Sequence, residues 1–285
     1  MLTYSLFALL QQQRHIPRTT PKAVVMFSSG ITSWAAGKRY AETHGTEGMV
    51  LLFADTRIED EDNYRFLYEA AENIGAPMVV IADGRDPWEV MRDVKLLGNS
   101  QFDPCSKILK RQLLDRWRNT NCDQATTDII LGLGWDEEHR ILRVQSRTKP
   151  WRYIAPLCDK PWISKVECLE WATREGIRPP RLYDMGFAHA NCGGFCVKAG
   201  QASFALLLKH FPERYAAHEA WEEHLRTIVG DHSIMKDRRG GTTKRLTMRQ
   251  FRLRLEREGE GACDKTDIGG CGCALALDDD PEDSD

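Results

Sequence analysis

Short apolar runs alternate with amphipathic segments over the first two thirds of the chain. The apolar runs are rich in Val, Ile and Leu, as is typical of strands that are buried on both faces of a parallel sheet. They cover residues 23–27, 48–54, 78–81 and 127–134. Between them apolar residues recur at spacings of three and four, for example Tyr64, Leu67 and Ala71 in the segment 60–74, which is the period of one helix face. The alternation predicts an α/β fold in which parallel strands are joined by right-handed helical crossovers.

The same pattern predicts the organisation of the whole chain. A shorter run over 153–157 contains Pro156 and predicts an edge strand, because proline cannot donate to a strand ladder. Further helices are predicted over 86–95, 104–117, 164–176, 201–210 and 213–228. We therefore expect an N-terminal helix over 1–20, an α/β domain over 21–178, a helical region with cysteines over 179–275 and a disordered acidic tail over 276–285.

Composition narrows the class of protein. The chain has 285 residues, a formal net charge of −3 and 42% hydrophobic residues, so it can bury an ordinary core and has no global basic field. We see no export segment and no apolar stretch that could span a membrane, and we expect a cytoplasmic protein with no membrane partner. The nine cysteines then indicate a metal, a cluster or redox chemistry rather than disulfides.

The turn after the first predicted strand is the most informative stretch. Ser28, Ser29, Gly30, Thr32 and Ser33 lie between that strand and a segment of good helix formers. A strand that leads through small residues into a helix points backbone N–H groups and the positive helix end at an anion, and the hydroxyls add donors. Phosphate is the predicted ligand, although a plain turn capped by serine would have the same composition.

Charged residues follow the second and third strands. Asp55 ends the second strand, where α/β sheets present ligand-binding groups. After the third, Cys105 is followed by Lys107, Lys110 and Arg111. Three cations near the N-terminal end of a helix are unfavourable to its dipole, so they are either solvated or bind an anion. Such cations also lower the pKa of a neighbouring thiol, here that of Cys105.

The fourth strand and the later cysteines supply further candidates. Gly132 would let the backbone approach a ligand, and Arg140 can bind phosphate through two parallel N–H donors; a charged surface loop is the alternative. Cys192 and Cys196 flank two glycines and form a knuckle that can enclose a metal, with Cys271 and Cys273 near the end of the chain. An iron–sulfur cluster, a zinc ion and cysteines without metal all remain open.

Together these motifs resemble the PP-loop, or adenine nucleotide α-hydrolase-like, superfamily. Within it they resemble the phosphoadenosine phosphosulfate reductase-like branch found in bacteria and phages. Residues 28–33 match the family's Ser-Gly-Gly-x-Asp-Ser loop except at Ser29 and Thr32, which replace Gly and Asp. Residues 104–111 resemble the cysteine- and lysine-containing element of that branch, and residues 180–183 with 191–196 resemble its cysteine knuckle. The resemblance covers roughly residues 20–215.

The resemblance implies a five-stranded, mostly parallel sheet between helices, Rossmann-like, with a Cys-containing helical extension. It implies an adenine nucleotide, ATP or phosphoadenylyl sulfate, with its phosphates on residues 28–33 and its adenine near Asp55. Lys110, Arg111 and Gly132 would also bind the nucleotide, and Mg²⁺ is a further expected cofactor. The residues expected to take part in catalysis are Cys105, Lys107 and Arg140.

Two reactions are compatible with the resemblance. Family members either cleave ATP between the α and β phosphates to adenylate an oxygen, or reduce an adenylylated sulfate with a cysteine thiolate. Thr32 replaces the acidic residue of the ATP-cleaving members, and the reductases' C-terminal Glu-Cys-Gly-x-His element has no match. The resemblance to relatives that handle sulfur also implies a four-iron cluster on Cys105, Cys192 and Cys196, with Cys273 preferred to Cys271 as the fourth ligand.

A second hypothesis is a non-catalytic nucleotide sensor or an accessory protein of nucleic-acid modification. Thr32 and the basic segment 236–252 favour it, and a tRNA or a DNA base is then a possible acceptor. The acceptor and the oligomeric state are not predicted.

Overall fold

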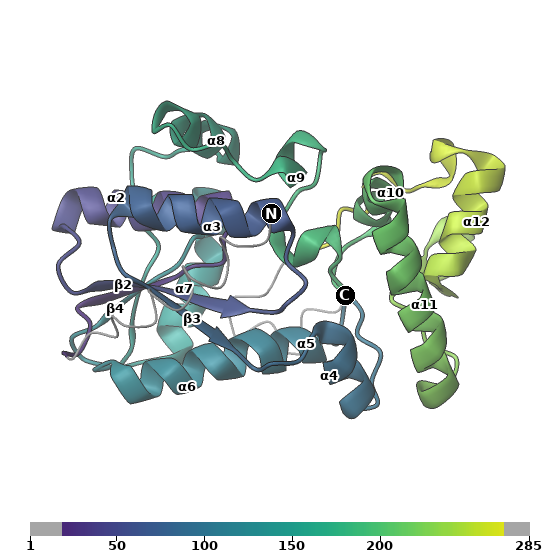
Figure 1. Cartoon of the computed structure of the whole chain (residues 1–285), viewed down its shortest axis with the longest axis horizontal. Coiled ribbons are helices and arrows are strands. Elements are labelled where there is room, and N and C mark those ends of the chain that lie inside the picture. Colours follow the sequence, from purple (N-terminus) through teal and green to yellow (C-terminus); the bar gives the residue numbers. More distant parts are fainter. Residues whose placement is uncertain (1–18, 271–285) are drawn as a thin grey trace.

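The computed structural model describes residues 19–270 (Figure 1). Several predictions lie outside these residues. They are the N-terminal helix up to residue 18, Cys271, Cys273 and the acidic tail over 276–285.

A five-stranded parallel sheet forms the centre of the molecule, with the strand order β3-β2-β1-β4-β5. The strands are β1 (Ala23–Met26), β2 (Met49–Asp55), β3 (Met78–Ala82), β4 (Asp128–Ile130) and β5 (Arg152–Ile154). Val24 of β1 pairs with Val50 of β2 on one side and with Ile129 of β4 on the other. The fold class predicted from the sequence is therefore confirmed, including the edge position of β5.

Helices cover both faces of this sheet (Figure 1). One face is covered by α2 (Ile31–His44), α3 (Glu61–Ile74) and α8 (Lys165–Arg174), and the other by α6 (Gln112–Asn121) and α7 (Glu138–Arg147). Val25 belongs to the core under α2 and α3, whereas Val24 belongs to the core on the opposite face. Successive strand residues point to opposite faces, so both must be apolar in a sheet covered twice.

The C-terminal helices pack beyond the carboxyl edge of the sheet, at the right of Figure 1. They are α10 (Gln201–His210), α11 (Pro212–Val229) and α12 (Met248–Glu258), with a hairpin of β6 (Met235–Asp237) and β7 (Lys244–Leu246). Their core contains Phe204 and Phe251, but also Trp88 and Met91 from α4 (Pro87–Asp93). A helix from the first half of the chain thus completes the core of the C-terminal region.

The helix predicted over 104–117 contains an irregular turn. It begins as α5 (Pro104–Ser106), passes through a π-helical turn at Lys107–Arg111 and continues as α6. A π-turn changes which side chains share a helix face, and such turns are frequent at functional sites. The short helix α9 (Arg181–Asp184) and a 3₁₀ turn at Asn191–Gly194 lead from the sheet to the C-terminal region.

Glu222 of α11 joins three elements of that region. Its fully buried carboxylate accepts hydrogen bonds from the N–H of Ile234, before β6, at 3.0 Å and from the N–H of Met248, in α12, at 2.6 Å. Burial raises the pKa of Glu222 to about 7, against the opposing effect of the two N–H donors. The folded protein therefore binds a proton here at pH values where the unfolded chain does not.

We expect the stability of the protein to fall as the pH rises from about 5 to about 7. When the pKa of a group is higher in the folded than in the unfolded protein, its contribution to stability is complete below the unfolded-state pKa. That contribution is lost as the pH rises through the folded-state pKa, and the free energy of unfolding falls by at most about 1.4 kcal/mol per pH unit. Glu222→Gln should remove most of this slope, whereas Glu223→Gln on the neighbouring, more exposed residue should not. Chemical denaturation of the three proteins at pH 5 and pH 8 measures the difference; equal slopes in all three would contradict the assignment.

Candidate functional site

An open cleft lies at the carboxyl ends of β1, β2 and β4, the edge at which parallel α/β sheets bind ligands. The volume of the cleft, including the part that is open to solvent, is about 850 Å³. Six of the predicted nucleotide-binding and catalytic residues line it: Ser28, Gly30, Thr32, Lys110, Gly132 and Arg140. Residues that are more than a hundred positions apart in the sequence therefore meet at one edge of the sheet.

Gly132 lets the loop after β4 lie directly against the start of α2. A Cβ atom at this position would lie 2.6 Å from both N and Cα of Ser33, which is closer than non-bonded backbone and Cβ atoms approach. The predicted approach of Gly132 to a ligand stays a prediction, because the group that this glycine approaches here is the 28–33 turn itself.

The 28–33 turn keeps its shape through side-chain hydrogen bonds. Ser29 has φ +58°, a left-handed conformation that glycine adopts more easily. Its hydroxyl donates to the Ser28 carbonyl at 2.6 Å and accepts from Nδ2 of Asn63 at 2.7 Å, while the Ser33 hydroxyl donates to the Gly30 carbonyl at 2.8 Å. Ser29 is therefore held in a left-handed conformation, which glycine adopts more easily, by its hydrogen bonds with Asn63 and Ser28.

Tyr183 contacts the N-terminal end of α2. The N–H of Ile31 donates to the Tyr183 hydroxyl at 3.2 Å, so this amide already has a partner, which the sequence did not predict. Lys165 lies against the Tyr183 ring, with Nζ 4.9 Å from the ring centroid, and donates to the Ala188 carbonyl. Tyr183 and Lys165 both line the cleft.

Four side chains that can carry positive charge surround the cleft. Lys110, Arg140, Lys165 and His189 come from four separate segments of the chain. Arg140 forms an ion pair with Glu137, three residues before it on the same turn of chain. An anion in the cleft would thus meet converging cations as well as the end of α2.

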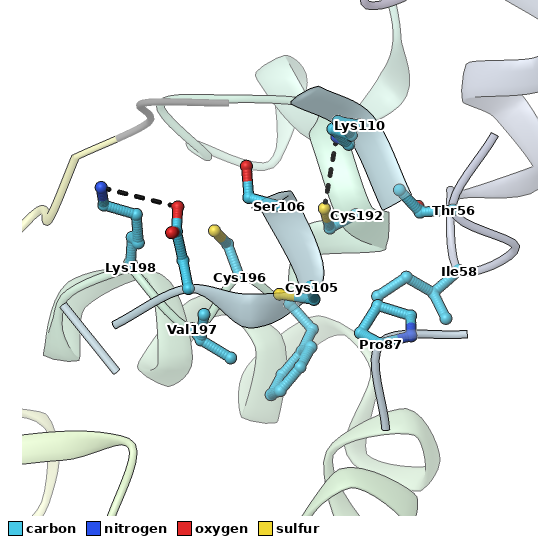
Figure 2. A pocket seen from close by; sticks show the side chains of 12 residues that line it. Thr56, Ile58, Pro87, Cys105, Ser106, Lys110, Cys192, Cys196, Val197 and Lys198 are labelled. Carbon is cyan, nitrogen blue, oxygen red and sulfur yellow. Dashed lines mark hydrogen bonds and ion pairs between the residues drawn. The ribbon is translucent and has the colours of Figure 1, made fainter. Parts of the chain in front are cut away.

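A second, small cavity adjoins this cleft and is lined by three cysteines (Figure 2). Cys105 comes from α5, and Cys192 and Cys196 come from the knuckle. Figure 2 shows the three sulfurs around the same space. The structure therefore brings together three of the four cysteines that we predicted to share a site; the fourth, Cys273, lies outside the described residues.

Lys110 lies between the two cavities and lines both of them. Its Nζ is 3.8 Å from Sγ of Cys192 and 3.7 Å from Oε1 of Glu59. The Glu59 carboxylate is buried and also accepts from the N–H of Cys192 at 2.5 Å and from the hydroxyl of Thr56 at 3.2 Å. Burial raises the pKa of Glu59, while Lys110 and these donors favour its charged form. The carboxylate thus fixes both the ammonium group and the backbone of the cysteine.

The knuckle has an unusual backbone that depends on its glycines. Cys192, Gly193 and Gly194 have φ values of +56°, +59° and +83°. A Cβ atom on Gly193 would lie 2.5 Å from the Ile58 carbonyl oxygen. A glycine at position 193 is therefore needed for the knuckle to contact the loop after β2.

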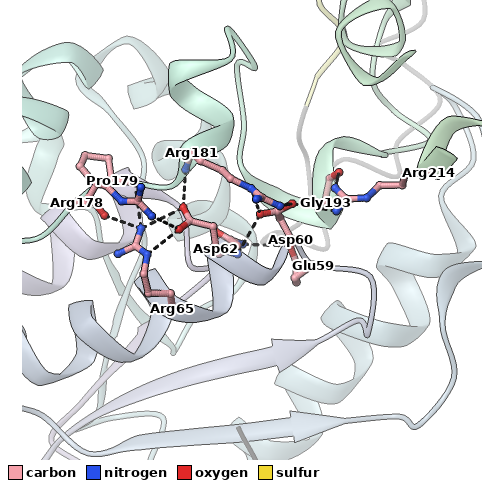
Figure 3. Close-up of polar contacts among 10 residues, drawn as sticks. Glu59, Asp60, Asp62, Arg65, Arg178, Pro179, Arg181, Gly193 and Arg214 are labelled. Carbon is pink, nitrogen blue, oxygen red and sulfur yellow. Dashed lines mark hydrogen bonds and ion pairs between the residues drawn. The ribbon is translucent and has the colours of Figure 1, made fainter. Parts of the chain in front are cut away.

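Two aspartates at the start of α3 attach the C-terminal region to the sheet (Figure 3). Asp60 accepts two hydrogen bonds from Arg181, both at 2.8 Å, and one from Arg214 at 3.0 Å. Asp62 accepts from Arg178 at 2.6 Å and from the N–H of Arg181 at 2.7 Å. Burial alone would raise the pKa of Asp60, but Arg181, a backbone N–H and Arg214 together hold it below its usual range. These bonds position the knuckle and Tyr183 over the cleft.

Five predicted residues line neither cavity: Ser29 and Ser33, whose contacts within the 28–33 turn are given above, and Lys107, Arg111 and Asp55. Lys107 is exposed on the π-turn. Arg111 is buried and forms two hydrogen bonds of 3.1 Å with the carboxylate of Asp103, and the carboxylate of Asp55 accepts from the Tyr64 hydroxyl at 2.6 Å. Their predicted roles in catalysis and nucleotide binding stay predictions, whereas their observed contacts are structural.

Sequence reasoning did not assign a role to Glu59, Lys165, Tyr183 or His189. Glu59 begins a run of four acidic residues that leads into the first turn of α3, and such runs are common at helix N-termini because they favour the helix dipole. Nothing in its local sequence distinguishes it from its exposed neighbour Glu61. Lys165 and His189 are single polar residues in loops or helix starts, and only the fold brings them to the cleft.

The cysteine cavity does not match a metal site within the part of the chain that the structure describes. Over residues 19–270 no group of three or more His, Cys, Asp or Glu side chains is placed to hold a metal ion. Three thiols line one cavity, but their arrangement is not that of ligands around a common ion. The predicted cluster therefore has no support from the described residues.

Most arginines in the basic segment 236–252 have acidic partners. Arg239 pairs with Asp237, Arg245 with Asp231, and Arg252 with Glu219. This neutralises much of the charge that suggested a nucleic-acid surface. Among the residues described, no helix is both long and apolar enough to cross a membrane.

No family model matches the chain, and no curated protein matches it. The chain is similar to two solved enzyme structures. One is phosphoadenylyl-sulfate reductase from Candida auris in complex with phosphate, at a TM-score of 0.42 and 15% identity over 63% of this chain and 85% of that chain. The other is NH₃-dependent NAD synthetase from Campylobacter jejuni with a nitrate ion, at a TM-score of 0.37 and 11% identity over 78% of this chain and 88% of that chain. Both TM-scores are below 0.5, so the fold is assigned from the strand order and register of the chain itself.

Proposed function

We propose that the chain is an adenine-nucleotide-binding enzyme that acts on sulfur, of the phosphoadenosine phosphosulfate reductase-like kind. The observation that carries the proposal is the position of Lys110, which lines the cleft over the 28–33 turn and also lies 3.8 Å from the sulfur of Cys192. One ammonium group can therefore contact a phosphate in the cleft and a thiol in the adjoining cavity.

The proposed roles follow from these positions. The hydroxyls of Ser28 and Thr32 and the cations Lys110 and Arg140 bind the phosphates. Cys192 supplies the thiolate, which bonds to the sulfur of an adenylylated sulfate. The bond from that sulfur to the bridging oxygen breaks, and the adenosine phosphate leaves with the electron pair. Lys110 stabilises negative charge on the departing phosphate.

A second reaction, cleavage of ATP with release of AMP and pyrophosphate, would use the same cleft. Thr32 favours the first reaction because the ATP-cleaving members of the resembled family carry an acidic residue there. The proposal includes no cluster and no nucleic-acid acceptor, given the cysteine arrangement and the paired arginines described above. Release of adenosine 3′,5′-bisphosphate from phosphoadenylyl sulfate, measured beside AMP and pyrophosphate release from ATP, distinguishes the two reactions.

We expect Lys110→Met to weaken the binding of adenosine 3′,5′-bisphosphate by about 10- to 100-fold, because a hydrogen bond from a charged group contributes about 1.5–3 kcal/mol. Lys107→Met is the matched control: it removes the same charge three residues earlier, from an exposed position outside both cavities. Isothermal titration calorimetry on the three proteins makes the comparison.

Lys110→Arg keeps the charge beside Glu59 and should recover part of the lost affinity, while thermal unfolding reports whether each variant is folded. Equal affinity in folded Lys110→Met and wild-type protein would sink the proposal. So would equal losses in the Lys110 and Lys107 variants, because a general loss of charge would then explain both.

A further inference from the structure

Asn63 joins the 28–33 turn to the loop after β2 through a single amide group. It lies in the first turn of α3 and is buried, with 1% of its surface exposed. Its Nδ2 donates to the Ser29 hydroxyl at 2.7 Å and to Oε2 of Glu59 at 3.2 Å. Both protons of this nitrogen therefore have acceptors, and the two acceptors belong to different segments of the chain.

These two bonds complete a continuous path from the turn to the cysteine knuckle. Oε2 of Glu59 accepts from Asn63 and also from the N–H of Cys192, at 2.5 Å. The path thus runs from Ser29 through Asn63 and Glu59 to Cys192, and no hydrogen bond along it is longer than 3.2 Å.

The residues at the two ends of the path share an unusual backbone conformation. Ser29 has φ +58° and Cys192 has φ +56°. Left-handed conformations of residues other than glycine persist only where the surrounding structure holds them. The path gives one hydrogen bond to each of these residues, so it helps to hold both conformations at once.

We propose that Asn63 is a positioning residue that couples an anion bound on the 28–33 turn to the reactivity of the Cys192 thiol. The inference rests on the proposed function for the identity of that anion, a phosphate of an adenine nucleotide. An anion that binds the turn favours one conformation of Ser29. Asn63 then holds Glu59, and Glu59 holds the N–H of Cys192, so the knuckle opens less often when the turn is occupied.

The burial of Cys192 makes this opening measurable. Only 8% of its surface is exposed, so a reagent reaches the thiol fully when the knuckle opens locally. Such local opening becomes rarer as the segment is stabilised. An occupied turn should therefore slow alkylation of Cys192, and a held knuckle should in turn strengthen anion binding, because coupling between two sites is reciprocal.

Direct shielding of the thiol by the nucleotide is the alternative cause of slower alkylation. Lys110 lines both the cleft and the cysteine cavity, so a ligand that contacts it is close to Cys192. Shielding does not depend on the residue at position 63, whereas the coupling does. Asn63→Leu separates the two causes, because leucine is similar in size to asparagine and donates no side-chain hydrogen bond.

We expect Asn63→Leu to fold, because neither acceptor loses its last partner. The Ser29 hydroxyl still donates to the Ser28 carbonyl, and Glu59 still accepts from Thr56 and from the N–H of Cys192. Thermal unfolding verifies this. If leucine at this position prevents folding, Asn63→Ala, which adds no volume, makes the same test.

The first test measures alkylation of Cys192 in the full-length protein. N-ethylmaleimide is added with and without adenosine 3′,5′-bisphosphate at about ten times the Kd of each variant, and the Cys192 peptide is quantified by mass spectrometry. We expect the ligand to slow alkylation at least about fivefold in wild type and less than about twofold in Asn63→Leu. Asn73→Leu is the matched control and should keep the wild-type ratio: Asn73 is also on α3 and bonds to Trp34 and Glu175, away from both cavities.

Each result of this test has a distinct meaning. Equal protection in Asn63→Leu and wild type would show direct shielding and overturn the proposal, as would equal loss of protection in the Asn63 and Asn73 variants. Binding of the bisphosphate without protection of wild type would overturn the coupling and leave the proposed function intact. Absence of binding in calorimetry would overturn the proposed function, and the coupling with it.

Glu59→Gln supplies a second test, by conservative replacement. The amide oxygen of glutamine can accept from both Asn63 and the N–H of Cys192, so the bonded path is kept while the negative charge beside Lys110 is removed. We expect this variant to retain at least half of the wild-type protection. Complete loss of protection in folded Glu59→Gln would show that the charge, and not the bonded path through Asn63, causes the effect, and would overturn the proposal.

Discussion

Asp60→Asn is expected to lower the free energy of unfolding by about 3 kcal/mol at pH 7, as removal of one partner from a buried ion pair does. The Asp60 side chain is fully buried and pairs with Arg181 and Arg214. Asparagine keeps the size and the helix cap of α3 but leaves two guanidinium groups without their counter-charge. The side chains of both arginines are about one third exposed, at 36% and 29%, so water recovers part of the loss.

Asp231→Asn is the control for this prediction. Asp231 also pairs with two arginines, Arg226 and Arg245, but its side chain is 72% exposed. Water screens exposed pairs so that they contribute little to stability, and this variant should therefore differ little from wild type in urea denaturation. A similar loss in both variants would mean that burial of Asp60 is not the cause.

The pH dependence gives a second check. The pKa of Asp60 is held below its usual range in the folded protein, so its contribution is present above the ordinary aspartate pKa and is lost as the pH falls through the lowered value. The difference between Asp60→Asn and wild type should therefore be full at pH 7 and shrink below about pH 4. A difference that is constant down to pH 3 would contradict the ionic explanation.

The sheet was predictable because its strands have to be apolar on both faces. Val24 and Val25 pack into the cores on opposite faces of the sheet. Two successive apolar residues are required only in a strand that helices cover on both faces. β4 was harder to delimit: regular pairing ends at Ile130, although the apolar run continues to Leu133. The loop turns there because Gly132 lies against α2, a contact between segments about a hundred residues apart that no local pattern records.

The candidate site was predictable only in part, for a related reason. At helical spacing Lys107, Lys110 and Arg111 share one face, but the π-turn separates them. One is exposed, one lies between the two cavities, and one is bound to Asp103. The three predictions were made from one pattern, and the irregular turn gives each residue a different environment.

Gly132→Ala is expected to have the largest effect on the cleft. The added methyl carbon would lie 2.6 Å from N and Cα of Ser33, so either α2 or the loop after β4 has to move. Overpacking of this kind costs about 1–3 kcal/mol of stability. Because the displaced atoms belong to the 28–33 turn, we also expect the affinity for adenosine 3′,5′-bisphosphate to fall by more than about tenfold, the factor that 1.4 kcal/mol represents.

Gly134→Ala makes the same substitution two residues later, where the new Cβ atom would lie 2.6 Å from Oδ1 of Asp136. That atom is the end of an exposed, flexible side chain, which can rotate away, so both stability and affinity should change little. The two variants therefore separate a rigid backbone contact from a movable side chain at the same nominal distance. Calorimetric titration and thermal unfolding of both measure the outcome. If folded Gly132→Ala binds the nucleotide as wild type does, the 28–33 turn is not the phosphate site. The added methyl group contacts backbone atoms of that turn, so the turn cannot keep its place by rotating a side chain away.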